Sequence, residues 1–99
     1  MTPLFSVRPS ARFARLASRL TDQQSQEFPG RYAEALEILK ADPTNRTGRY
    51  RIKKLKGVAA GEGQWRLALG RFRFRYDIAG TVVELVYCGL RREHTYRER

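Results

Sequence analysis

Cysteine and histidine are nearly absent from this chain, which has one residue of each, Cys88 and His94. A single cysteine excludes an internal disulfide and is typical of proteins in a reducing compartment. Metal sites need several Cys, His or carboxylate ligands at short spacings, and the sequence shows no such spacing. We therefore expect neither a metal site nor a cofactor.

Long hydrophobic runs are also missing. No segment has the roughly 20 consecutive apolar residues that a membrane-spanning helix needs, and the first residues lack the apolar run of a signal peptide. The sequence contains no internal repeat and no low-complexity tail. These absences predict a cytoplasmic protein that does not bind membranes. The length of 99 residues predicts a single domain, residues 1–99, built around one core.

Acidic residues are outnumbered two to one. The chain has 20 Lys and Arg against 10 Asp and Glu, a formal net charge of +10 and a pI near 10.6. Residues 1–50 carry eight basic side chains against five acidic ones, whereas residues 51–99 carry twelve against five. This excess of positive charge predicts a polyanion or an acidic protein as the partner, bound mainly by the second half of the chain.

Apolar and polar residues alternate from Trp65 to Ile78, which indicates strands with one buried face. Gly70-Arg71 interrupts the alternation and predicts a two-residue hairpin loop, because glycine at the first loop position suits a type II′ turn. The loop in turn predicts the register of the two strands. The expected pairs are Leu69 with Phe72, Ala68 with Arg73, Leu67 with Phe74, Arg66 with Arg75, and Trp65 with Tyr76.

A third strand is expected from Thr81 to Cys88, after a turn at Ala79-Gly80. If the pairing simply continues, each residue of this strand has a predicted neighbour, although a one-residue bulge would shift them all. The expected neighbours are Val83 and Tyr76, Leu85 and Phe74, and Tyr87 and Phe72 on the apolar face, with Glu84 and Arg75, and Val86 and Arg73, on the other.

The arginines of that second face allow two interpretations. Arg73 is expected between Ala68 and Val86, with no carboxylate beside it, so its guanidinium is well placed to hold a phosphate through two hydrogen bonds. The alternative is a solvated face on which the arginine side chains lie along the sheet with their stems packed. Composition alone favours neither interpretation.

The first half of the chain predicts an edge strand and two helices. The strand is expected from Pro3 to Val7, and a helix follows with Pro9 in its first turn. The apolar stripe of this helix is Phe13, Leu16, Ala17 and Leu20. A second helix is expected from Arg31 to Ala41, after a break at Pro29-Gly30, and Asp42-Pro43 ends it. The whole pattern predicts an α+β fold with two N-terminal helices, paired as an antiparallel hairpin, on one face of a small, mostly antiparallel sheet.

With these elements in this order, the sequence resembles the RelE/ParE superfamily of small bacterial toxins from type II toxin–antitoxin pairs. The resemblance covers nearly the whole chain. Its carriers are the edge strand with the Pro-Ser-Ala start of the first helix, the Asp42-Pro43 helix end, the segment from Lys54 to Gly57, the block from Trp65 to Ile78, and Arg91-Arg92-Glu93 followed by Tyr96. It implies a RelE-like fold. It also implies that the sheet face away from the helices carries the active cleft in members that are nucleases.

Cleavage of RNA by attack of its 2′-hydroxyl on the adjacent phosphate needs a base, an acid and cations that stabilise the phosphorane, and it needs no metal. The resemblance implies that Arg73 is the phosphate clamp and that Arg66 is the basic residue that follows the aromatic one. The resemblance also implies that Arg91 is the arginine just past the last strand, although Arg92 could take this role. Some nucleases of the superfamily have a lysine where this chain has Ala68.

The last residues supply two further candidates. Tyr96 matches the C-terminal tyrosine of the family as a stacking platform or proton donor, and the alternative is a packed aromatic side chain. His94 lies in the same segment and is the side-chain type that titrates near neutrality, and the alternative is an exposed histidine without a role. Contacts with messenger or ribosomal RNA are expected from Lys53, Lys54, Lys56, Arg75 and Arg92.

The sequence therefore predicts the toxin of a type II toxin–antitoxin pair that cuts messenger RNA on the ribosome. Its expected partners are messenger RNA on the ribosome and a cognate antitoxin that covers the basic cleft or displaces the C-terminal segment, and we expect oligomers only through the antitoxin. Two alternatives stay open. One is a gyrase-inhibiting toxin of the same fold, and the other is a basic RNA-binding domain without catalysis.

Overall fold

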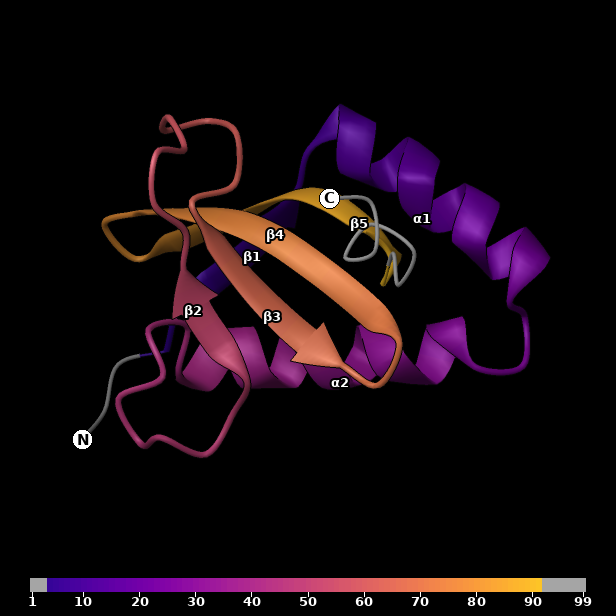
Figure 1. The fold of residues 1–99 in the computed structure, drawn as a ribbon, viewed down its shortest axis with the longest axis horizontal. Helices are drawn as coiled ribbons and strands as arrows, with labels where there is room; N and C mark the ends of the chain where they lie inside the picture. The colour runs from indigo at the N-terminus through magenta and orange to yellow at the C-terminus, as the bar shows by residue number, and fades with distance from the viewer. Residues whose placement is uncertain (1–3, 92–99) are drawn as a thin grey trace, which may run out of the picture.

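The computed structural model describes residues 4–91 as a five-stranded sheet with two helices packed against one of its faces (Figure 1). The strand order is β1-β5-β4-β3-β2, and only β1 and β5 pair in parallel. This arrangement confirms the predicted α+β class and the mostly antiparallel sheet. In chain order the elements are β1 (Ser6–Pro9), α1 (Ala11–Gln23), α2 (Phe28–Ala41), β2 (Ile52–Lys54), β3 (Trp65–Leu69), β4 (Phe72–Ala79) and β5 (Val82–Leu90).

Both helices begin elsewhere than predicted. Pro9 is the last residue of β1 and not part of the first helix, because Ser10 is the N-cap of α1 and its hydroxyl accepts a hydrogen bond of 3.0 Å from the Phe13 N–H. The second helix starts at Phe28, three residues before the predicted start. Pro29 therefore lies in the first turn, where a helix lacks N–H partners anyway, and it does not break the helix. The predicted end at Asp42 is confirmed.

Aromatic side chains between the helices and the sheet form the centre of the core. The Phe28 ring of α2 lies 5.4 Å from Phe72 and 6.1 Å from Phe74, measured between centroids, and Phe13 of α1 lies 6.5 Å from Phe74. All four rings are fully buried. Trp65, predicted to be a core residue, is partly buried at the margin of this cluster. The apolar stripes of both helices thus cover the apolar face of the sheet, as predicted.

The β3–β4 hairpin has the predicted register at all five pairs, from Leu69–Phe72 to Trp65–Tyr76. Gly70 has φ of 58°, whereas Arg71 is not among the described residues with positive φ. A positive φ at the first loop position alone agrees with the expected type II′ turn.

The predicted register of β5 is wrong. Ala79 pairs with Val82 across a Gly80-Thr81 loop, which moves the pairing by two residues, and a bulge between Arg75 and Tyr76 then moves it by one more. A shift of two residues leaves each side chain of β5 on its predicted face of the sheet, whereas a shift of one residue moves it to the opposite face. The observed partners are Tyr76 and Leu85, Asp77 and Glu84, Arg75 and Tyr87, Phe74 and Cys88, and Arg73 and Gly89. Tyr87 is therefore not in the core, Cys88 is, and Glu84 does not lie beside Arg75.

The loop after α2 is organised by a buried carboxylate. Asp42, 6% exposed, accepts hydrogen bonds from the Thr47 hydroxyl (2.7 Å) and from the N–H groups of Arg46 (2.7 Å) and Thr47 (3.0 Å). Burial alone would raise the pKa of Asp42, but these three bonds and the Arg46 charge together hold it below its ordinary value of 3.8. The next residue, Pro43, accepts a 2.6 Å bond from the buried Tyr76 hydroxyl, which ties the loop to the core.

Substitution of Asp42 tests this loop. Asp42→Asn removes the charge that strengthens the three bonds, so we expect the free energy of unfolding near pH 7 to fall by about 1 to 3 kcal/mol. The lowered pKa means that the carboxylate stabilises the folded state above pH 3.8, and that this contribution is lost as the pH falls through the pKa of the folded state. Urea unfolding near pH 7 and near pH 3 should therefore show a smaller pH effect in the variant than in the parent.

Asp22→Asn is the matched control, because Asp22 is exposed on α1 and its replacement removes the same charge. We expect it to change the free energy of unfolding by less than about 0.5 kcal/mol. Equal losses in the two variants would show that the hydrogen bonds of Asp42 do not stabilise the fold.

Candidate functional site

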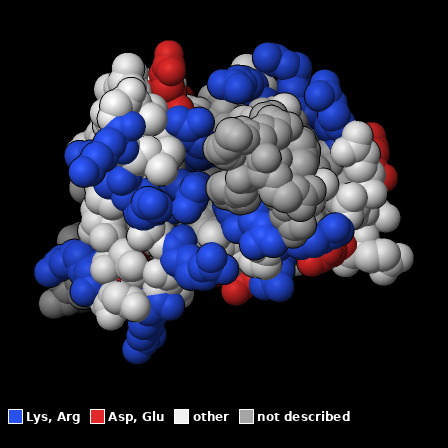
Figure 2. Space-filling view, in the orientation of Figure 1, with Lys and Arg blue, Asp and Glu red and all other residues white. Residues whose placement is uncertain are grey.

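The sheet face away from the helices carries a row of basic side chains. We call it the outer face. Cross-strand pairing aligns Lys53 of β2, Arg66 of β3, Arg75 of β4 and Tyr87 of β5 in one row. Figure 2 shows Lys and Arg side chains gathered over the β2–β3 side of this face. Pairing residues on neighbouring strands lie about 5 Å apart, so the three cations of the row form a continuous positive strip.

The adjacent row contains Arg73 between two small residues. Ala68 and Gly89 are its cross-strand neighbours on β3 and β5. A side chain at Gly89 would overlap the ring and hydroxyl of Tyr87, which shows that the Tyr87 ring extends over this glycine. Arg12 of α1 reaches the same ring, with its guanidinium carbon 5.5 Å from the centroid. Because Ala68 and Gly89 are small, longer side chains such as that of Tyr87 can extend over the sheet beside Arg73.

Backbone carbonyls hold two of the arginines in place. Arg73 Nη1 donates to the carbonyl oxygens of Gly70 and Phe72, both at 2.9 Å, so this guanidinium is held against the hairpin loop. Arg75 Nε donates to the Gly63 carbonyl at 3.1 Å. In contrast, Arg66 Nε is buried and has no hydrogen-bond partner among residues 4–91.

An acidic residue fixes the loop that holds Arg75. The two carboxylate oxygens of Asp77 accept hydrogen bonds from the N–H groups of Gly63 and Gln64, both at 3.0 Å. Asp77 thus positions Gly63, whose carbonyl in turn holds Arg75. Glu84 pairs with Asp77 from β5, the strand beside β1, so Glu84 is three strands away from Lys53 of β2.

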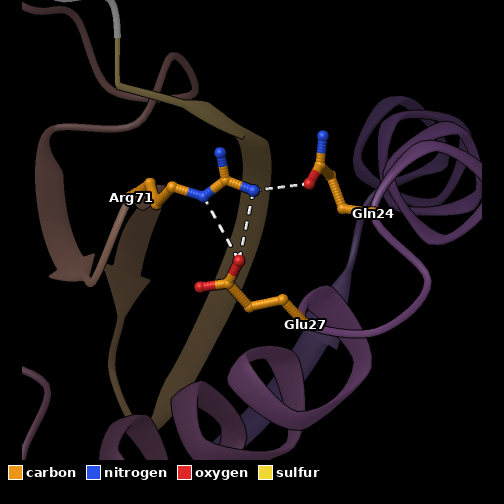
Figure 3. Close-up of polar contacts among 3 residues, drawn as sticks. All are labelled: Gln24, Glu27 and Arg71. Atoms are coloured by element: carbon orange, nitrogen blue, oxygen red, sulfur yellow. Dashed lines mark hydrogen bonds and ion pairs between the residues drawn. The ribbon is translucent and has the colours of Figure 1, made fainter.

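The tip of the β3–β4 hairpin is tied to the turn between the helices (Figure 3). The Arg71 guanidinium forms an ion pair with Glu27, with Nη2 and Oε1 3.1 Å apart, and donates a hydrogen bond to Gln24. The Arg71 carbonyl accepts a 2.7 Å bond from the Arg91 N–H. The backbone just past β5 therefore lies beside the hairpin loop, and this places the start of the C-terminal segment near the loop that holds Arg73.

The structure brings some of the predicted site residues together and separates others. Lys53, Arg66, Arg73 and Arg75 share the outer face, as the pairing argument predicted, and their roles stay predictions. Lys54 does not share it, because its strand position points the other way and its Nζ lies 5.6 Å from the centroid of the Trp65 ring. Lys56 is exposed in the loop after β2, and Arg91 is exposed just after β5. Three other candidates, Arg92, His94 and Tyr96, lie outside the described residues.

Two residues of this face were missed by the sequence analysis. Tyr87 was expected in the core, because nothing in the alternation of β5 marks the bulge. Arg51 precedes β2, and its carbonyl accepts a 2.9 Å bond from the Ala68 N–H, which places it beside the second row. The sequence feature that could have identified Arg51 was its position in the same basic segment as Lys53 and Lys54.

Several kinds of site have no support in residues 4–91. This part of the chain contains no group of three or more His, Cys, Asp or Glu side chains that could hold a metal ion. None of its helices is both long enough and apolar enough to cross a membrane. Burial raises the pKa of the Cys88 thiol to about 12, so this cysteine is not a thiolate nucleophile at neutral pH.

Gly63 offers a test of how the outer face is positioned. It has φ of 84°, and a Cβ there would lie 2.8 Å from both Arg75 Cβ and Val86 Cγ2. Gly63→Ala therefore combines backbone strain with overlap, and we expect the free energy of unfolding to fall by about 2 to 4 kcal/mol. Gly61→Ala is the control in the same loop, since φ is 94° but no atom lies within 4 Å of the new Cβ. It should cost about 1 to 2 kcal/mol in urea unfolding. Equal costs would argue against tight packing of Gly63 on Arg75.

Comparison with known proteins supports the fold. No protein-family model and no curated protein sequence matches this chain. Among solved structures, it is similar to a chain of the toxin–antitoxin complex RelBE2 from Mycobacterium tuberculosis, with a TM-score of 0.58 and 21% sequence identity. The match covers 89% of this chain and 99% of that chain. At this identity the match establishes architecture rather than activity. The protein therefore has the RelE-like fold that its sequence predicted, with two helices on one face of a five-stranded, mostly antiparallel sheet.

Proposed function

We propose that this protein is the toxin of a type II toxin–antitoxin pair and that it cleaves messenger RNA on the ribosome. The observation that carries the proposal is the outer face, on which Lys53, Arg66 and Arg75 lie in one row and Arg73 in the next. Four cations on one face of a RelE-like sheet suit a polyanionic substrate better than a protein surface. The similarity to a chain of a toxin–antitoxin complex supports the same assignment.

The proposed reaction uses the RNA as its own nucleophile. The 2′-oxygen bonds to phosphorus while the bond to the 5′-oxygen breaks, which leaves a 2′,3′-cyclic phosphate and a 5′-hydroxyl. Arg73, with Nη1 already held by two carbonyls, would hold the reacting phosphate without much loss of side-chain entropy. The Nη groups of Arg66 would stabilise the charge that develops on the phosphorane, which leaves its Nε–H for another acceptor. We assign the two proton transfers to the segment after β5, where Arg91 or Arg92 would complete the cationic site and His94 or Tyr96 would move the protons.

The proposal includes an antitoxin and a cellular location. A net charge of +10 favours an acidic antitoxin, and we propose that it covers the outer face or displaces the C-terminal segment. On this view the chain acts in the cytoplasm, where messenger RNA is translated, and it forms oligomers only through the antitoxin.

Replacement of Arg73 tests the nuclease. The chain and its Arg73→Ala variant are expressed from a tightly controlled promoter, and the 5′ ends of messenger RNA on ribosomes are mapped. We expect growth arrest and new cuts within codons for the parent. The variant should cleave at least about 100-fold more slowly, because a preorganised donor to the phosphorane is lost. Arg19→Ala is the control, since Arg19 is exposed on α1, and it should cleave like the parent.

Other outcomes would contradict the proposal in different ways. Growth arrest with double-strand DNA breaks and no cuts in messenger RNA would indicate gyrase inhibition. Binding of RNA with neither arrest nor cuts would indicate an RNA-binding domain without catalysis. Because Arg73 also bonds to the hairpin loop, urea unfolding of the variant must show that it is folded before the loss of cleavage is attributed to the site.

A further inference from the structure

A small pocket opens between β2 and β3 on the outer face. Arg51, Ile52, Lys53, Arg66 and Ala68 line it, and its volume is about 240 Å³. All three charged residues that line it are cations. None of the three takes part in an ion pair within residues 4–91. We call this the basic pocket.

Ala68 has the smallest side chain of the five residues that line the pocket. Ala68 is buried, and its N–H donates to the carbonyl of Arg51, so the two residues lie side by side on neighbouring strands. Lys53 and Arg66 form the next cross-strand pair along the same strands. Three long cationic side chains therefore surround Ala68, whose side chain is a single methyl group.

One of these side chains lacks an acceptor. Arg66 Nε is buried and has no hydrogen-bond partner in the described part of the chain. Buried donors in folded proteins almost always have a partner, from the protein, from water or from a ligand. An oxygen atom placed in the basic pocket would supply this acceptor, and a negatively charged oxygen would also offset the repulsion among the three cations.

We propose that the basic pocket binds a phosphodiester group of RNA, separate from the phosphate held by Arg73. This inference rests on the proposed function and adds Arg51 to the residues that contact the substrate. A phosphate has oxygens for both the Arg66 Nε–H and the forked guanidinium of Arg51, and a pocket of this size suits such a group.

The surroundings favour a polynucleotide over an isolated anion or an acidic peptide. Arg75 follows Lys53 and Arg66 in the same cross-strand row, and Arg73 lies in the adjacent row. Neighbouring strands are about 5 Å apart, so the pocket and Arg73 can contact successive phosphates of one strand. The repeating charge of an RNA backbone would bind at both the basic pocket and Arg73, whereas a single carboxylate would occupy only one of these two sites.

The first experiment observes the Arg66 Nε–H directly by ¹H–¹⁵N correlation NMR. Its signal is assigned by its loss in Arg66→Lys, and the probe is a short 2′-O-methyl RNA, which lacks the attacking hydroxyl and cannot be cleaved. We expect this signal to shift on addition of the RNA, with a smaller shift for inorganic phosphate. A poly-glutamate peptide is the competing ligand. A shift with the peptide but not with the RNA would overturn the proposal, as would no shift with either.

The second experiment measures affinity for the same RNA at several salt concentrations by fluorescence anisotropy. Arg51→Ala should weaken binding by about tenfold at low salt. It should also reduce the slope of log K against log salt by about 0.7, the value for one phosphate contact on a single strand. Arg49→Ala is the matched control, because Arg49 is an exposed arginine two residues away that does not line the pocket. Equal effects of the two substitutions would overturn the proposal.

These measurements separate the inference from the proposed function. RNA binding that depends on Arg51, in a protein that cuts no RNA in cells, would support the pocket and contradict the nuclease. Ribosomal cleavage by the parent, with unchanged RNA affinity in Arg51→Ala, would support the nuclease and contradict the pocket. Arg51 is exposed and only its backbone is bonded in the sheet, so its replacement by alanine should leave the fold intact.

Discussion

The alternation of side chains along the β3–β4 hairpin is the constraint on which both faces of this protein depend. Phe72, Phe74 and Tyr76 point into the core, where the first two meet Phe28 of α2, and the intervening Arg73 and Arg75 must then point to the outer face. A slip of one residue would bury the arginines and expose the aromatic rings, so the energy of the core also maintains the basic face. The Gly70-Arg71 loop sets this register, and contacts of Arg71 with Glu27 and Gln24 secure the loop.

Backbone carbonyls restrict two cations of the outer face, and a carboxylate positions one of these carbonyls. Carbonyls of the hairpin hold Arg73, and the Gly63 carbonyl holds Arg75. Asp77 positions Gly63 by accepting a hydrogen bond from the Gly63 N–H. A carbonyl accepts a hydrogen bond but carries no net charge, so these bonds restrict the position of a guanidinium and do not themselves cancel its charge. This is the arrangement that a binding face for phosphates needs, because the entropy of ordering long side chains is already lost in the folded protein.

The fold and the surface chemistry support the functional assignment in different ways. The RelE-like architecture is shared with a chain of a toxin–antitoxin complex, but at 21% identity architecture does not specify an activity. The basic rows belong to this chain and argue for a polyanionic ligand on their own. The basic pocket lies where Ala68 leaves space that Arg51 and Lys53 surround, so the cations near the β2 edge come from neighbouring strands and not from position 68 itself.

The sequence by itself determined the elements that depend on residues close together in the chain. Two-residue alternation and a glycine loop were enough for the β3–β4 register, and helical spacing with Asp42-Pro43 was enough for the end of α2. Only the tertiary structure decided the register of β5, because the alternation of this strand does not mark Val86 as the extra residue of the bulge. The same holds for the basic pocket: Arg51 and Arg66 are fifteen positions apart in sequence, and only the pairing of β2 with β3 brings their side chains around one cavity.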